Sequence, residues 1–111
     1  MTRIARNTVS LTALLLIGCL SGVSAQHQAA DQQYMGAMDR MQKDMQSGMD
    51  QDATKAWVKM MIPHHRGAIE MSEIVLKETK DPEIRKMAQK SKTEQQKEVR
   101  KLQAWLKKHG G

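Results

Sequence analysis

The stretch "KMMIPHHRGAIEM" (residues 59–71) decides the fold, because its apolar residues stay in helical phase on both sides of a proline. From Trp57 to Val75, apolar or histidine residues recur three or four positions apart. A proline inside a helix removes one backbone N–H and displaces the carbonyl four residues earlier, at a cost of about 3 kcal/mol. We therefore predict one continuous helix, kinked at Pro63. The alternative is that Pro63 begins a separate helix.

The chain is expected to be all-α, because no stretch alternates apolar and polar residues as a half-buried strand does. Gly48 is a helix stop, and Asp81-Pro82-Glu83 combines a cap, a first-turn proline and a first-turn acid. The predicted helices run from about Asp31 to Ser47, from Asp50 or Asp52 to Glu78, and from Pro82 to about Lys108. Short loops favour a small antiparallel three-helix bundle.

The middle helix is apolar over roughly 220° of its circumference at 100° per residue, whereas a surface helix needs only about 100°. It is therefore expected to be the central helix, with a neighbour on each side. The first helix has an apolar face of one tyrosine and five methionines: Tyr34, Met35, Met38, Met41, Met45 and Met49.

The N-terminus has the features of a secretory signal. Arg3 and Arg6 precede an apolar stretch at residues 9–20, which is too short to span a membrane, and Val23-Ser24-Ala25 fits a cleavage site. We predict a signal peptide over residues 1–25, a polar lead-in over residues 26–30 and a helical domain over residues 31–109.

Cys19 leaves a second option for export. Leu16-Ile17-Gly18-Cys19 also fits the pattern at which a bacterial lipid is attached, so the protein is either released into the periplasm or held at the membrane through Cys19. Cys19 is the only cysteine, so the exported domain has no thiol and no disulfide. Its 16 lysines and arginines (18 less Arg3 and Arg6) alternate with 12 acids along helical faces, and it has no aromatic stacking platform, so we do not expect a nucleic-acid partner.

The two histidines are the candidate site residues. Each lies one helical turn after a methionine: Met60 before His64, and Met61 before His65. Met71 follows His64 by seven residues on the same side.

The loops are expected to bring further donors to the level of the histidines. In antiparallel neighbours, the loop near residue 49 places Met35 and Met38 level with His64 and Met61. The loop near residue 80 places Gln95 level with His65, and Glu98 near Ile62.

This set suits a soft metal ion. Thioethers prefer Cu(I) or Ag(I), and imidazole binds both Cu(I) and Cu(II). A neighbouring carboxylate or amide fixes the tautomer of a ligating histidine. The alternative is structural: methionine stripes commonly fill cores, and histidine, glutamine and glutamate can form a hydrogen-bonded polar core layer.

The motif Met60-Met61-Ile62-Pro63-His64-His65, with Gly67-Ala68-Ile69 and Met71, resembles the signature of the CopM-like family of exported bacterial proteins, long catalogued as a domain of unknown function. The second family motif is matched by Asp81-Pro82-Glu83-Ile84-Arg85, Ala88, Gln95, Glu98-Val99 and Trp105-Leu106. The resemblance implies a helical bundle of the four-helix, ferritin-like kind, periplasmic export and copper binding. The implied ligands are Met60 or Met61, His64 and His65, with Gln95 and Glu98 beside them. Since only three helices are predicted, a homodimer would complete the bundle.

The expected function is binding without catalysis, because no nucleophile–base pair, phosphate-binding loop or carboxylate cleft is recognisable. We predict a periplasmic Met/His protein that sequesters or carries Cu(I), with Cu(II) and Ag(I) as alternative ions. Its partners would be other periplasmic copper-handling proteins or a second copy. The competing hypothesis is a structural or adaptor bundle of the cell envelope that binds no metal.

Overall fold

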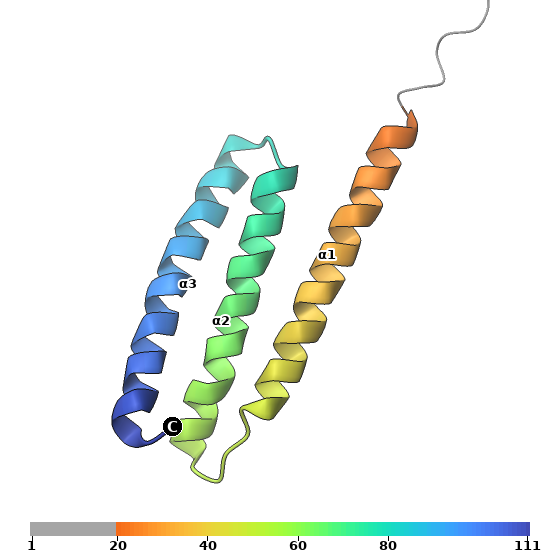
Figure 1. The fold of residues 1–111 in the computed structure, drawn as a ribbon. Coiled ribbons are helices and arrows are strands. Elements are labelled where there is room, and N and C mark those ends of the chain that lie inside the picture. Colours follow the sequence, from red (N-terminus) through yellow and green to blue (C-terminus); the bar gives the residue numbers. More distant parts are fainter. Residues whose placement is uncertain (1–19) are drawn as a thin grey trace, which may run out of the picture.

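The computed structural model describes residues 20–111, which form three helices side by side in one layer (Figure 1). They are α1 (Leu20–Ser47), α2 (Ala53–Glu78) and α3 (Pro82–His109). α2 packs against both α1 and α3, whereas α1 and α3 do not contact each other. The predictions of an all-α three-helix fold and of a central middle helix are confirmed. Most of the predicted signal peptide, Cys19 included, lies outside the described residues, and none of the described helices has an apolar stretch long enough to cross a membrane.

The predicted caps form as their side-chain chemistry requires. The Asp52 carboxylate accepts hydrogen bonds from two backbone N–H groups at the start of α2, and Asp81 does the same at the start of α3. At the end of α3, Gly110 adopts the left-handed conformation (φ 73°) that glycine reaches without strain. These contacts explain why both ends of α2 and α3 fall within about two residues of the predicted positions.

The predicted start of α1 is wrong. The helix already includes Leu20, so residues 26–30 are helical and Asp31 is an internal residue rather than a cap. No glycine or proline interrupts residues 24–35, and alanine and glutamine are good helix formers. Ala30 is buried, so tertiary packing also holds this segment in the helix.

α2 continues through Pro63, so the continuous helix is confirmed and the separate-helix alternative is wrong. The proline cannot donate to the carbonyl of Lys59, and the end of α1 packs over that carbonyl. A Cβ atom at Gly48 would lie 2.9 Å from the Lys59 carbonyl carbon and 3.0 Å from its oxygen. Glycine is therefore required here by a close backbone approach. The kink at Pro63 stays a prediction.

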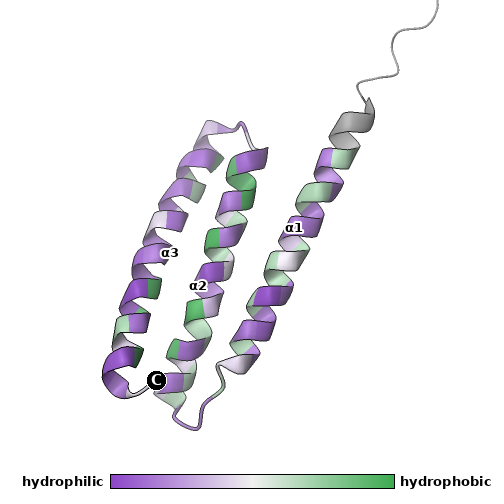
Figure 2. Cartoon of the chain, viewed as in Figure 1, coloured by the Kyte–Doolittle hydropathy of each residue, from purple (hydrophilic) through white to green (hydrophobic). Residues whose placement is uncertain are grey.

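The two helix–helix seams differ in their side chains. Between α2 and α3, Val58, Ile62 and Val99 form a small apolar core, flanked by Ile69, Leu102, Trp105 and Leu106. Between α1 and α2, the buried residues of α1 are small, Ala30 and Ala37, and Gly48 is buried just after the helix ends. Figure 2 shows hydrophobic residues spread along α2 and only scattered over α1 and α3.

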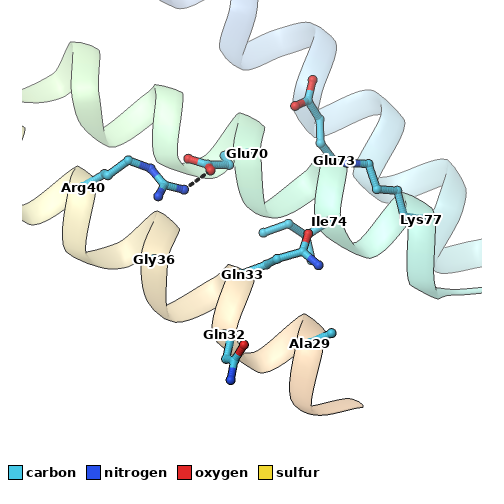
Figure 3. Close-up of a pocket in the computed structure, with 9 residues that line it drawn as sticks. All are labelled: Ala29, Gln32, Gln33, Gly36, Arg40, Glu70, Glu73, Ile74 and Lys77. Carbon is cyan, nitrogen blue, oxygen red and sulfur yellow. Dashed lines mark hydrogen bonds and ion pairs between the residues drawn. The ribbon is translucent and has the colours of Figure 1, made fainter. Parts of the chain in front are cut away.

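The predicted apolar face of α1 is only partly buried. Met35, Met38 and Met49 are 56%, 42% and 73% exposed, while Met41 and Met45 are half-buried. The small residues bring the α1 backbone close to α2, and the methionines lie along one side of this contact. The other side is polar, with the ion pair of Arg40 and Glu70 (Figure 3). A second ion pair, between Lys92 and Glu73 at 2.8 Å, joins α3 to α2.

Candidate metal centre

His65 lies at the α2–α3 seam, where its side chain is only 12% exposed. Its Nε2 atom is 2.7 Å from the Glu98 carboxylate, which reaches across from α3 and is half exposed. A carboxylate accepts a proton donor, so this contact places the ring N–H on Nε2. The Glu98 contact therefore fixes both the orientation and the tautomer of the His65 ring.

The other ring nitrogen of His65 has no hydrogen-bond partner. Nδ1 is buried, and no donor among the described residues reaches it. In the tautomer fixed by Glu98, Nδ1 carries a free lone pair. The Gln95 Oε1 atom, one turn before Glu98 on α3, is also buried and without a partner. Two buried acceptors that lack a donor are uncommon in a folded protein, and either a donor or a cation would satisfy them.

His64 lies elsewhere on α2. It is exposed, and its ring centroid is 5.9 Å from that of His65, with the ring planes at 59°. Adjacent helix residues point about 100° apart. His65 therefore turns towards α3, whereas His64 lies on the exposed side of α2, away from that seam.

The predicted register between α2 and α3 is confirmed to within a turn. Glu98, rather than Gln95, is level with His65, and Gln95 comes about one turn before Glu98 on α3. Glu98 therefore lies beside the histidine, as expected, and Gln95 is half-buried on the same helix. Met61, four residues before His65, is half-buried one turn back on the same helix.

The predicted register between α1 and α2 is wrong. Met41 packs on Gly67, and Arg40 pairs with Glu70, so Met45 is the residue of α1 nearest in level to His64. Met35 and Met38 are displaced by about nine residues, roughly 14 Å at 1.5 Å per residue, and are exposed. Gly48 lies level with Lys59 and Met60, so the chain continues for more than a turn of α2 before Asp52 caps that helix. The connection between α1 and α2 is therefore longer than the tight turn that the register estimate assumed.

The structure divides the predicted methionine ligands into separate groups. Met61 lies nearest to His65 in the helix, Met71 is half-buried two turns after His64, and Met35 and Met38 lie out on α1. Met60 lines a groove between α1 and α2 together with Met41, Met45 and Met49. The groove was not predicted from the sequence, because the register estimated from the loop length paired the wrong turns of α1 and α2. Gly48 and Gly67, which permit the close approach, were the available signal.

The donor set fits a soft ion better than a hard or borderline one. Within residues 20–111, no three His, Cys, Asp or Glu side chains are grouped so that they would hold a metal. A zinc-type set of nitrogen, oxygen and thiolate ligands is therefore missing from this part of the chain. The remaining donors near His65 and His64 are thioethers, which prefer Cu(I) and Ag(I).

A family comparison places the chain among known sequences. The profile described as Domain of unknown function (DUF305) matches residues 8–106, which include nearly all of the three helices. The chain belongs to the DUF305 family. No curated protein matches this DUF305 chain. The resemblance noted from the proline–histidine motif is confirmed at the level of this family, whose description assigns no activity.

Proposed function

We propose that this DUF305 protein binds copper as Cu(I) through Nδ1 of His65. The observation that supports this proposal is the buried Nδ1 atom without a partner, on a ring whose Nε2 is held by Glu98. Metal-binding histidines commonly donate their second ring N–H to a carboxylate, which orients the ring and raises its basicity. Glu98, at 2.7 Å from Nε2, would hold the His65 ring in this way.

Thioether sulfur completes the proposed donor set. Met61 lies one turn before His65 on the same helix, and His64 and Met71 lie on the adjacent side of α2. The Gln95 oxygen, buried and unpartnered, supplies a hydrogen-bond acceptor or a weak ligand beside the ion. Cu(I) is favoured by the sulfur donors, Ag(I) shares their preference, and Cu(II) would rely on the imidazoles.

The proposed setting is the periplasm. The signal-like N-terminus and the absence of cysteine after Cys19 support it, because methionine provides soft ligands where thiols would be oxidised. The protein would sequester copper or carry it to other periplasmic copper-handling proteins, without catalysing a reaction. Lipid attachment at Cys19 would instead hold the same domain at the membrane.

A competition titration tests this proposal. Cu(I) is titrated against a chelator of known affinity, with the protein, its His65→Ala variant and His109→Ala as a matched control. His109 stacks on Trp105 at 4.1 Å, far along α3 from His65, so its loss removes an imidazole outside the site. We expect His65→Ala to weaken binding at least tenfold and His109→Ala to leave it unchanged. Equal affinity for all three proteins would overturn the proposal.

A second candidate function is supported by the open face of the helix layer. Six large hydrophobic residues among the described residues are more than two-fifths exposed: Met35, Met38, Met49, Trp57, Ile84 and Met87. At 100° per residue, Trp57 lies within about 20° of His64 on α2, and Met87 within about 20° of Glu98 on α3. Since Glu98 reaches His65 on that side of the layer, these residues share one face, to which the methionine stripe of α1 also belongs.

On this account the protein is a structural bundle whose open face binds a second copy. Two copies of this face would bury these apolar side chains against each other in an isologous dimer. Light scattering after size-exclusion chromatography tests this with two variants, Trp57→Ser and Met87→Ser. The control is Lys90→Ser, which changes an exposed charged residue instead. We expect a metal-independent dimer that the first two substitutions dissociate. A monomer at every concentration would overturn this candidate.

A further inference from the structure

The seam between α1 and α2 contains a second group of soft donors, separate from His65. A groove of about 470 Å³ is lined by four methionines and two glutamines: Met41, Met45, Met49, Met60, Gln42 and Gln46. No carboxylate, imidazole or ammonium group lines it. Its lining is therefore almost entirely hydrocarbon and thioether sulfur.

Close backbone packing brings these methionines together. Met41 and Met45 lie four residues apart, so their side chains are about 40° apart on one side of α1, and Met49 follows just after the end of that helix. The Met41 sulfur lies 2.6 Å from the position that a Cβ atom of Gly67 would occupy. A Cβ atom at Gly48 would lie 3.0 Å from the backbone nitrogen of Met60. The two glycines thus hold the α1 stripe against Met60 on α2.

Filling a core does not account for this group. A methionine that fills a core is buried, whereas Met49 is 73% exposed and Met45 is only half-buried. Exposed methionine gains little from the hydrophobic effect, and leucine has an equal helix propensity. The property that methionine has and leucine lacks is a soft sulfur donor.

We propose that this groove is an all-thioether binding site for a soft monovalent cation, Cu(I) or Ag(I). It is distinct from the His65 centre, because Met60 and His65 point about 140° apart on α2, towards different neighbouring helices. The absence of nitrogen and carboxylate ligands from the lining selects against divalent ions such as Zn²⁺ and Cu²⁺. The proposal does not depend on copper binding at His65.

Methyl-labelled methionine tests the site residue by residue. The protein is labelled with ¹³C at the methionine methyl groups and titrated with Ag(I), which is redox-inert. We expect the methyl signals of Met41, Met45, Met49 and Met60 to shift together and saturate with the cation. Zn²⁺ should leave the four signals in place. Signals that stay unchanged with Ag(I) would overturn the proposal.

Matched leucine variants separate sulfur chemistry from packing. Replacing Met41, Met45 and Met49 by leucine keeps the apolar volume and the helix propensity, and should lower the Ag(I) stoichiometry by one. The control variant replaces three exposed methionines outside the groove, Met35, Met38 and Met87, and should keep the full stoichiometry. Equal stoichiometry for both triple variants would contradict the site.

A His65→Ala variant distinguishes this site from the proposed function. If Ag(I) still shifts the four methyl signals in that variant while its affinity at the histidine centre is lost, both sites exist. If the four signals shift and His65→Ala changes nothing, the groove stands and the His65 proposal fails. If the signals do not shift, the groove fails whatever the result at His65.

Discussion

At the scale of single residues, the sequence predicted the types of donor around His65 but not their atomic roles. Glu98 and Gln95 were expected near the histidines from a register estimate good to one turn; Glu98 contacts His65, and the Gln95 oxygen is buried about one turn before it on α3. The assignment of Nε2 to Glu98 and the unpartnered Nδ1 depend on side-chain rotamers that spacing does not encode. The adjacent histidines face different sides of α2, as 100° per residue requires.

Glu98→Gln tests the role of the carboxylate. Glutamine keeps an oxygen that accepts the Nε2 proton of His65, so the ring orientation should persist while the negative charge is lost. We expect Cu(I) affinity at His65 to fall by about 10- to 100-fold, the usual effect of changing a partner that orients a ligand. The chelator competition measures it, and Glu94→Gln, one turn away and exposed, is the control. Unchanged affinity in Glu98→Gln would show that the carboxylate has no part in binding.

Asp50 gives the stability of the α1–α2 loop a dependence on pH. Lys59 Nζ donates to its carboxylate at 2.7 Å, and the Asp52 N–H donates at 3.0 Å. The Lys59 contact, followed by the Asp52 N–H, lowers the pKa of Asp50 below its ordinary value of 3.8, because both favour the charged form. The stabilisation is therefore complete above the ordinary value and is lost as the pH falls below it.

The Asp50→Asn variant makes that dependence measurable. At neutral pH the free energy of unfolding should be higher for the natural protein than for the variant. The difference should shrink as the pH falls through 3.8 and below, where Asp50 becomes protonated. Urea unfolding followed by circular dichroism at several pH values measures it. A difference that stays constant with pH would contradict this assignment.

At the scale of helices, local chemistry fixed the helix ends, whereas backbone contacts fixed the register. Asp52, Asp81 and Gly110 act through their own side chain or conformation, so the sequence predicted the ends that they form. The α1–α2 register depends instead on the packing of Gly48 against Lys59 and of Met41 against Gly67. A glycine in a sequence does not reveal which backbone approaches it, so loop length alone placed the methionines of α1 at the wrong level.

Gly36 in α1 and Gly48 just after its end provide a test of this packing. Gly48→Ala would place a Cβ atom 2.9 Å from the backbone of Lys59, which cannot move aside, and should lower the free energy of unfolding by about 1–3 kcal/mol. At Gly36 the nearest atom, at 3.2 Å, is the mobile end of Arg40, so Gly36→Ala should be neutral or stabilise by up to about 1 kcal/mol. Urea unfolding measures both. Similar effects at the two positions would show that the close approach is not what requires Gly48.

At the scale of the whole molecule, the wide apolar arc of α2 divides into three strips: two contact the neighbouring helices and one is exposed. One edge, with Ile74 and Gly67, contacts α1, and the other, with Ile62 and Ile69, contacts α3. The middle of the arc contains Trp57 and His64 and stays exposed, because α1 and α3 do not meet over it. The sequence correctly predicted two neighbours but could not show that they leave this strip open. His64 and the exposed methionines consequently lie at the surface, as the proposed uptake and release of an ion would require.

The most direct test of the account is the response of the His65 ring nitrogens to a soft ion. The protein, labelled with ¹⁵N in its histidine rings, is titrated with Ag(I) and observed by NMR. The account predicts that the Nδ1 signal of His65 shifts strongly within the first equivalents, while Nε2 keeps the signature of a protonated nitrogen bound to Glu98. A titration in which Nδ1 of His65 does not move, although Ag(I) is bound, would contradict the account.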